Sequence, residues 1–242
     1  MKITDNKVQN IKPLEAYLYT NLLVSIIFLL FNPMYALLPI LLISLVFGRI
    51  NEKLIGFLFV ISITLMFANQ VFAPPSDIAS YIHMYQDTKI TTFSNIFYAY
   101  IDSINGRELL WFYYTKLLGS LFGYSNELFI LSNYLLIFSL LTYVSYLSSE
   151  NGRYNFVLIL FGLVFLEVTL FSNAYDLWRT EIASLIFVLS LLIGYSNKSK
   201  YLYRVVMYST IFVHTSMLLL VLLYELYSFF LSKKVLEFHG IL

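Results

Sequence analysis

Arg179 is the residue whose type and position most clearly suggest chemistry. It lies in the segment FSNAYDLWRTEIASLIFVLSLL, which begins at Phe171 and turns from polar to apolar. Asn173 and Asp176 are suitable N-cap residues, so we expect a helix to begin here with Arg179 in its first turn. A cation at that place opposes the helix dipole. The free backbone N–H groups and the guanidinium together, however, form a good binding site for a phosphate.

The same residues also allow a purely structural role for Arg179. The guanidinium could pair with Asp176, three residues earlier on the same helix, or extend to a membrane interface beside Trp178. Glu167, late in the preceding apolar run, could also form an ion pair with Arg179 across a short turn. A charge in the middle of a membrane span costs roughly 3 kcal/mol on insertion scales, so such residues are expected to be paired or to line a site.

His214 is the second candidate, in the apolar segment YSTIFVHTSMLLL. It follows Arg204 by about ten residues, which at 1.5 Å per residue predicts a depth of roughly 15 Å in a bilayer. A neutral histidine there can accept or donate a proton if a cavity reaches it, and Thr210, one turn earlier, shares its face. The alternative is a structural hydrogen bond between helices, worth roughly 0.6 kcal/mol.

The composition explains why polar residues inside apolar runs are informative. Of the 242 residues, 60% are hydrophobic and 12% are charged, whereas a soluble domain is about 25% charged. These values exclude soluble, disordered and fibrous proteins and predict an integral membrane protein. The net charge of +1 offers no field for nucleic acid, so no nucleic-acid partner is expected. Because cysteine is absent and the three histidines lie far apart, no metal site is expected.

Continuous apolar runs predict an all-α fold, a polytopic bundle of about seven membrane spans forming one domain over residues 1–242. A strand interpretation is excluded because the runs do not alternate. The first run lacks a small-residue cleavage site and is expected to remain as a span. The predicted spans are Leu14–Phe31, Pro33–Phe47, Leu54–Ala73, Asn126–Ser148, Tyr154–Phe171, Asp176–Tyr195 and Val205–Phe230.

Lysine and arginine in the short loops predict the orientation. The N-terminus and residues 48–53 and 197–204 are basic, and placing them in the cytoplasm puts residues 74–107 outside. The number of membrane crossings agrees with this orientation only if Glu108–Phe122 does not cross the membrane. Its central Lys116 and its aromatic residues fit an amphipathic helix at the outer interface, so residues 74–125 are expected to form an outer loop with that helix. Lys233 and Lys234 then lie outside, against the positive-inside rule.

Four segments in this order and spacing, across roughly residues 70–225, resemble elements of the EpsG-like and Wzy-like polysaccharide polymerases. They are PPSDIASYIHMYQ, INGRELLWFYYTKLLGSLFG, SNAYDLWRTEIASLIFVLS and FVHTSMLLL. The resemblance implies a glycosyltransferase of the bacterial inner membrane that polymerises undecaprenyl-pyrophosphate-linked repeat units into O-antigen or capsule. The reaction would face the periplasm and need no cofactor, nucleotide sugar or metal. A chain-length regulator and a flippase would be its protein partners.

The resemblance also implies roles for individual residues. Arg179, with Arg107 as a second candidate, would hold the departing pyrophosphate. Asp77, Glu108 and His214 would bind the acceptor or act as the general base. Two features depart from the family. Arg179 is followed by Thr180-Glu181 where the family commonly has Gln, and the chain ends at Leu242 with fewer spans than expected. A truncated product or a short member is therefore expected.

Two further function classes are compatible with a membrane bundle. A flippase of the same lipid-linked units would need polar residues along a continuous path through several spans. Lysine and arginine are almost absent from the predicted span interiors, which disfavours a flippase. A non-catalytic scaffold of a polysaccharide assembly complex would be indifferent to the polar residues at the outer helix ends.

Overall fold

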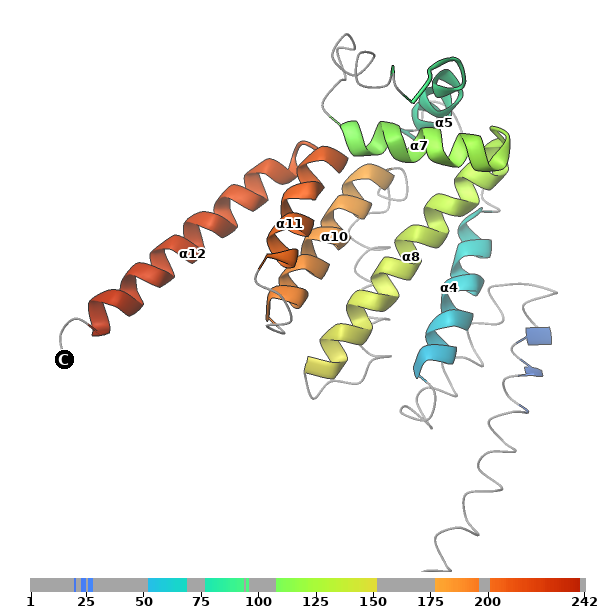
Figure 1. Cartoon of the computed structure of the whole chain (residues 1–242). Coiled ribbons are helices and arrows are strands. Elements are labelled where there is room, and N and C mark those ends of the chain that lie inside the picture. The colour runs from blue at the N-terminus through green and yellow to red at the C-terminus, as the bar shows by residue number, and fades with distance from the viewer. Residues whose placement is uncertain are drawn as a thin grey trace, which may run out of the picture. The chain divides into compact units, whose positions relative to one another are not determined.

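The computed structural model describes residues 52–68, 77–93, 95, 108–151, 177–195 and 201–239, with Thr20, Leu23, Val24, Ile26 and Ile27. This part of the chain is helical and contains no strand, as the apolar runs predict (Figure 1). Its elements are α4 (Glu52–Ala68), α5 (Asp77–Asp87), the 3-10 helix η1 (Thr88–Ile90), α7 (Leu109–Phe122), α8 (Asn126–Asn151), α10 (Trp178–Tyr195), α11 (Leu202–Val213) and α12 (Met217–His239). The predicted spans Pro33–Phe47 and Tyr154–Phe171, and all but five residues of Leu14–Phe31, lie outside the described residues.

The contacts divide the chain into two compact units, and the single transmembrane domain over residues 1–242 stays a prediction. Unit 1 comprises residues 1–72 and 130–172, and unit 2 comprises residues 73–129 and 173–242. In unit 1 the ring of Phe67 on α4 packs against Tyr134 and Phe138 on α8, with ring centroids 5.6 and 5.3 Å away. The candidate residues for chemistry all fall in unit 2.

Two of the described helices are long and apolar enough to cross a membrane, judged by length and composition. They are Asn126–Ser149 within α8 and Trp178–Tyr195, which is α10. Both match predicted spans to within a few residues. Helix α4 covers the predicted span Leu54–Ala73 as far as Ala68, and residues 69–73 lie outside the described residues. The number of seven spans stays a prediction.

The prediction of one continuous span over Val205–Phe230 is wrong, because the helix breaks at His214. Helix α11 ends at Val213, His214 is extended with φ −151° and ψ 122°, and α12 begins at Met217. Tyr208 of α11 donates a hydrogen bond to Glu225 of α12 at 2.9 Å. This contact joins the two sides of the break, so α12 turns back from the end of α11 and diverges from it (Figure 1). His214 lies in the short link between the two helices. Hydropathy could not detect this turn, because it is only a few residues long and apolar sequence flanks it.

The outer loop contains more structure than its polarity predicts. Residues 77–90 form α5 and η1, and the predicted helix over residues 108–122 is confirmed as α7. Lys116, on which the prediction of an amphipathic interfacial helix rested, is buried. It is 8% exposed, and its Nζ donates 2.8 Å hydrogen bonds to the carbonyl of Thr88 and the hydroxyl of Tyr124. Lys116 therefore fixes η1, at the end of α5, to α7.

Candidate functional site

Glu108 occupies the N-cap position of α7, but its side chain does not cap that helix. The residue has φ −127° and ψ 62°, and its carboxylate makes no hydrogen bond to the backbone of the first turn. It is 5% exposed. A carboxylate buried to this degree requires charged or hydrogen-bonding partners, because burial removes its hydration.

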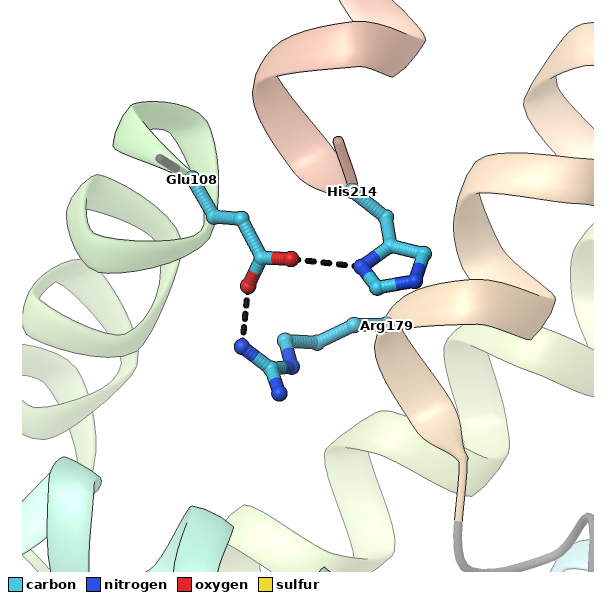
Figure 2. A network of polar contacts seen from close by, with 3 residues as sticks. All are labelled: Glu108, Arg179 and His214. Atoms are coloured by element: carbon cyan, nitrogen blue, oxygen red, sulfur yellow. Dashed lines mark hydrogen bonds and ion pairs between the residues drawn. The ribbon is translucent and has the colours of Figure 1, made fainter. Parts of the chain in front are cut away.

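Arg179 and His214 are the two partners of this carboxylate (Figure 2). Arg179 donates from Nη1 to Oε2 of Glu108, and His214 Nδ1 lies 2.5 Å from Oε1. One residue is 71 positions away in the sequence and the other is 106. We call these three residues the Glu108 network. Each carboxylate oxygen serves one partner, so both contacts exist at the same time.

The helices of unit 2 explain why these residues meet. Arg179 is the second residue of α10, and His214 directly follows the last residue of α11. The two helices pack closely along their lengths, and a Cβ on Gly194 near the end of α10 would lie 3.1 Å from the ring of Tyr203 on α11. Because the helices are antiparallel, the start of α10 lies beside the end of α11. Helix α7 contacts α11 and brings Glu108 to that end (Figure 1).

The contact with Glu108 determines which histidine nitrogen is available for chemistry. The carboxylate accepts the proton on Nδ1, so the neutral ring carries its lone pair on Nε2. Figure 2 shows Nε2 on the side of the ring away from Glu108. The same arrangement of carboxylate and imidazole orients the base in hydrolytic triads and stabilises the imidazolium that forms when the base takes a proton. The side chain of His214 is 23% exposed.

Aromatic side chains hold Arg179 from the other side. The guanidinium carbon lies 4.9 Å from the ring centroid of Tyr81 on α5. Tyr81 stacks on Trp178 at 5.7 Å and meets Trp111 edge-on at 5.6 Å. Tyr81, Trp111 and Trp178 are at most 2% exposed. The Nε of Arg179 is buried and has no hydrogen-bond partner among the described residues.

The structure brings together three of the five site residues predicted from the sequence: Glu108, Arg179 and His214. The side chain of Asp77, the first residue of α5, and the whole of Arg107 lie outside the described residues. The two acids expected to pair with Arg179, Asp176 and Glu167, also lie outside them. The acid that does pair with Arg179 is Glu108.

The predicted position of His214, deep inside a span, is corrected by the break between α11 and α12. His214 lies at a helix end, at the same end of the bundle as Arg179. Thr210 also has a different role, because its hydroxyl bonds to the carbonyl of Met207 and its own carbonyl accepts the backbone N–H of His214.

The sequence alone gave no indication of the aromatic group that packs around Arg179. Trp111, one of the aromatic residues of the predicted interfacial helix, is 1% exposed. Tyr81 received no role, although its spacing before the α7 segment is part of the resemblance. Aromatic residues are abundant throughout this chain, so residue type could not single out these positions.

Among the described residues, no group of three or more histidine, aspartate or glutamate side chains could hold a metal ion. No family model, no curated protein and no solved structure matches the chain.

Proposed function

We propose that this chain is a membrane glycosyltransferase that polymerises lipid-linked oligosaccharide repeat units. The single observation that carries the proposal is that Glu108 bridges a histidine and an arginine from two other helices. These residue types supply the two functions that the reaction needs, a general base and a cation for the leaving group. The resemblance to the EpsG-like and Wzy-like polymerases names the same three positions on independent grounds.

In the proposed reaction His214 activates the acceptor. Nε2 accepts the proton of a sugar hydroxyl while that oxygen attacks the anomeric carbon of the donor glycan. The bond between the anomeric carbon and the pyrophosphate oxygen breaks, and its electron pair leaves with the pyrophosphate. Glu108 orients the imidazole through Nδ1 and stabilises its protonated form.

Arg179 is proposed to bind the pyrophosphate that leaves with the lipid carrier. Its guanidinium is planar, permanently charged and able to donate several parallel hydrogen bonds to phosphate oxygens. Glu108 accepts from Nη1, and the other terminal nitrogen of the guanidinium, Nη2, is proposed to contact the ligand. Neutralising the departing charge lowers the barrier to cleavage of the glycosidic bond.

A scaffold without catalytic activity is the second candidate, favoured by one observation. Glu108 already compensates the charge of Arg179, as in ion pairs that serve structure alone. A buried ion pair fixes the relative placement of helices whatever the chain does. The two functions differ in what loss of Arg179 does to the glycan product.

The proposed location is the bacterial inner membrane, with the Glu108 network facing the periplasm. Two helices of sufficient length and apolarity support a membrane location, and basic loops support the orientation. The proposed partners are undecaprenyl-pyrophosphate-linked glycans, the lipid bilayer, a chain-length regulator and a flippase.

Arg179→Ala tests the function in cells that depend on this chain for their polysaccharide. We expect single-repeat glycans in place of long chains on a gel ladder, with normal levels of the protein in the membrane. Arg204→Ala is the matched control, because Arg204 lies in the same unit and pairs at 3.7 Å with Glu225, outside the Glu108 network. Normal chain length in Arg179→Ala would refute the pyrophosphate role. Lipid-linked units trapped on the cytoplasmic side would indicate a flippase.

A further inference from the structure

Building on the proposed function, we propose that Tyr81 is a positioning residue that holds the guanidinium of Arg179 ready for a diphosphate ligand. Neither the Glu108 network nor the proposed reaction assigns a role to Tyr81. It is nevertheless the aromatic side chain over whose ring the guanidinium lies, at 4.9 Å.

The surroundings of Tyr81 make it a rigid support. The ring is 2% exposed and is fixed between two indoles, stacked on Trp178 with an interplanar angle of 23° and edge-on to Trp111 at 61°. Trp178 immediately precedes Arg179 on α10, so the ring contacts both the arginine and its neighbour in the sequence. A support with so little freedom restricts the rotamers of Arg179.

Tyr81 and Glu108 constrain the guanidinium in complementary ways. The ring lies against the guanidinium, and the carboxylate binds Nη1 at its edge. An arginine held in this way loses less conformational entropy when it binds a phosphate, because its side chain is already ordered. The expected benefit is a lower dissociation constant for the ligand.

The position of Tyr81 depends on contacts that fix α5 within unit 2. Gln86 on α5 donates to the carbonyl of Tyr124 at 2.8 Å, and Lys116 on α7 donates to the carbonyl of Thr88 in η1 at 2.8 Å. Both contacts hold α5 and η1 to α7 and the turn that follows it. Helix α7 also positions Glu108. The contacts that hold α5 to α7 therefore fix Tyr81 and Glu108, the two residues that restrain Arg179, relative to each other.

Tryptophan fluorescence provides a direct test, because both tryptophans of the chain pack against Tyr81. Inorganic pyrophosphate is titrated into the full chain in detergent micelles. We expect Tyr81→Leu to weaken binding on the order of ten-fold, through loss of the cation–π contact and of the ordering it provides. Tyr81→Phe keeps the ring and should stay closer to the wild-type affinity. Equal affinity in the wild type and in Tyr81→Leu would overturn the proposal.

Tyr85→Leu controls for general damage to α5. Tyr85 lies one turn after Tyr81, is 0% exposed, and stacks on Phe129 at 4.1 Å rather than on Arg179. Its loss should leave pyrophosphate affinity within about two-fold of the wild type. A drop equal to that of Tyr81→Leu would mean that both tyrosines act only by stabilising α5, which contradicts a specific role for Tyr81.

A second measurement separates this proposal from the proposed function. In a sample with 15N-labelled arginine, the signals of Arg179 are identified by their loss in Arg179→Lys. The ring current of Tyr81 should displace these signals, and Tyr81→Leu should remove the displacement while Tyr81→Phe retains it. If the wild-type protein does not bind pyrophosphate, the proposed role of Arg179 in pyrophosphate binding is wrong. The positioning role of Tyr81 is then tested by the arginine signals alone. Unchanged signals in Tyr81→Leu would then overturn the positioning role.

Discussion

Glu108 and His214, 106 residues apart in the sequence, meet through Oε1 and Nδ1 at 2.5 Å. The first precedes α7 and the second separates α11 from α12. The other oxygen of the same carboxylate binds Arg179. The carboxylate of Glu108 therefore joins Arg179 and His214, the two polar residues that the sequence analysis placed first, and Nε2 of the histidine is not part of this contact.

Replacement of His214 should affect the reaction far more than the fold. We expect His214→Ala to slow polymerisation by roughly 10²- to 10⁴-fold, the range for loss of a general base. The rate is measured as incorporation of labelled repeat units by membranes that contain the variant.

His83→Ala is the matched control for His214→Ala. His83 also contacts a carboxylate, Asp87, at 2.9 Å, but its side chain is 79% exposed and lies outside the Glu108 network. We expect this variant to polymerise at the wild-type rate. Equal losses in the two histidine variants, or no loss in His214→Ala, would contradict the general-base role.

A double-mutant cycle should detect a strong coupling between Glu108 and Arg179. Glu108→Gln leaves the cation without its compensating charge, and Arg179→Gln leaves a buried carboxylate with only a histidine. Because Arg179 is partly exposed, we expect a coupling energy of about 1–3 kcal/mol in unfolding titrations in detergent, below the range for fully buried pairs.

The pair between Arg204 and Glu225 provides the reference cycle. Its side chains are 49% and 30% exposed, and the two nearest atoms lie 3.7 Å apart. Its coupling should fall below about 1 kcal/mol, as for surface ion pairs. If the coupling energy between Glu108 and Arg179 is no larger than that between Arg204 and Glu225, burial adds nothing to their interaction.

Lys116 should contribute to stability despite its charge. Lys116→Met removes the donor to the Thr88 carbonyl and to the Tyr124 hydroxyl, so we expect a loss of about 1–3 kcal/mol of unfolding free energy. The measurement is thermal unfolding in detergent, monitored by circular dichroism. Lys89→Met changes an exposed lysine of the adjoining 3-10 helix and should be neutral. A Lys116→Met variant as stable as the wild type would indicate that water replaces the ammonium group.

Membrane topology can be tested by reporters fused along the chain. From the basic loops we expect residue 90 outside and residue 200 in the cytoplasm. The contact between Tyr208 and Glu225 shows that α12 turns back from the end of α11, so we expect a reporter after residue 239 to be cytoplasmic as well. That location places Lys233 and Lys234 inside, in agreement with the positive-inside rule that a single span would violate. An external reading at the C-terminus would show that α12 does not fold back in the membrane.

The sequence by itself determined the helical class and the positions of several helices. Long apolar runs fix helix formation locally, because an apolar stretch in lipid must satisfy its own backbone hydrogen bonds. This local rule predicted α8 and α10 to within a few residues, and it identified Arg179 and His214 as polar residues in apolar surroundings.

Only the tertiary structure decided which polar groups meet. Hydropathy carries no information on which helix ends lie side by side, so neither the choice of Glu108 as the partner of Arg179 nor the burial of Lys116 could be predicted. The break at His214 was equally invisible, since a turn of a few residues barely changes the average hydropathy of its segment. The contacts of Glu108 exist because antiparallel packing of α10 against α11 places the start of one helix beside the end of the other, and this placement depends on side-chain packing along their whole length.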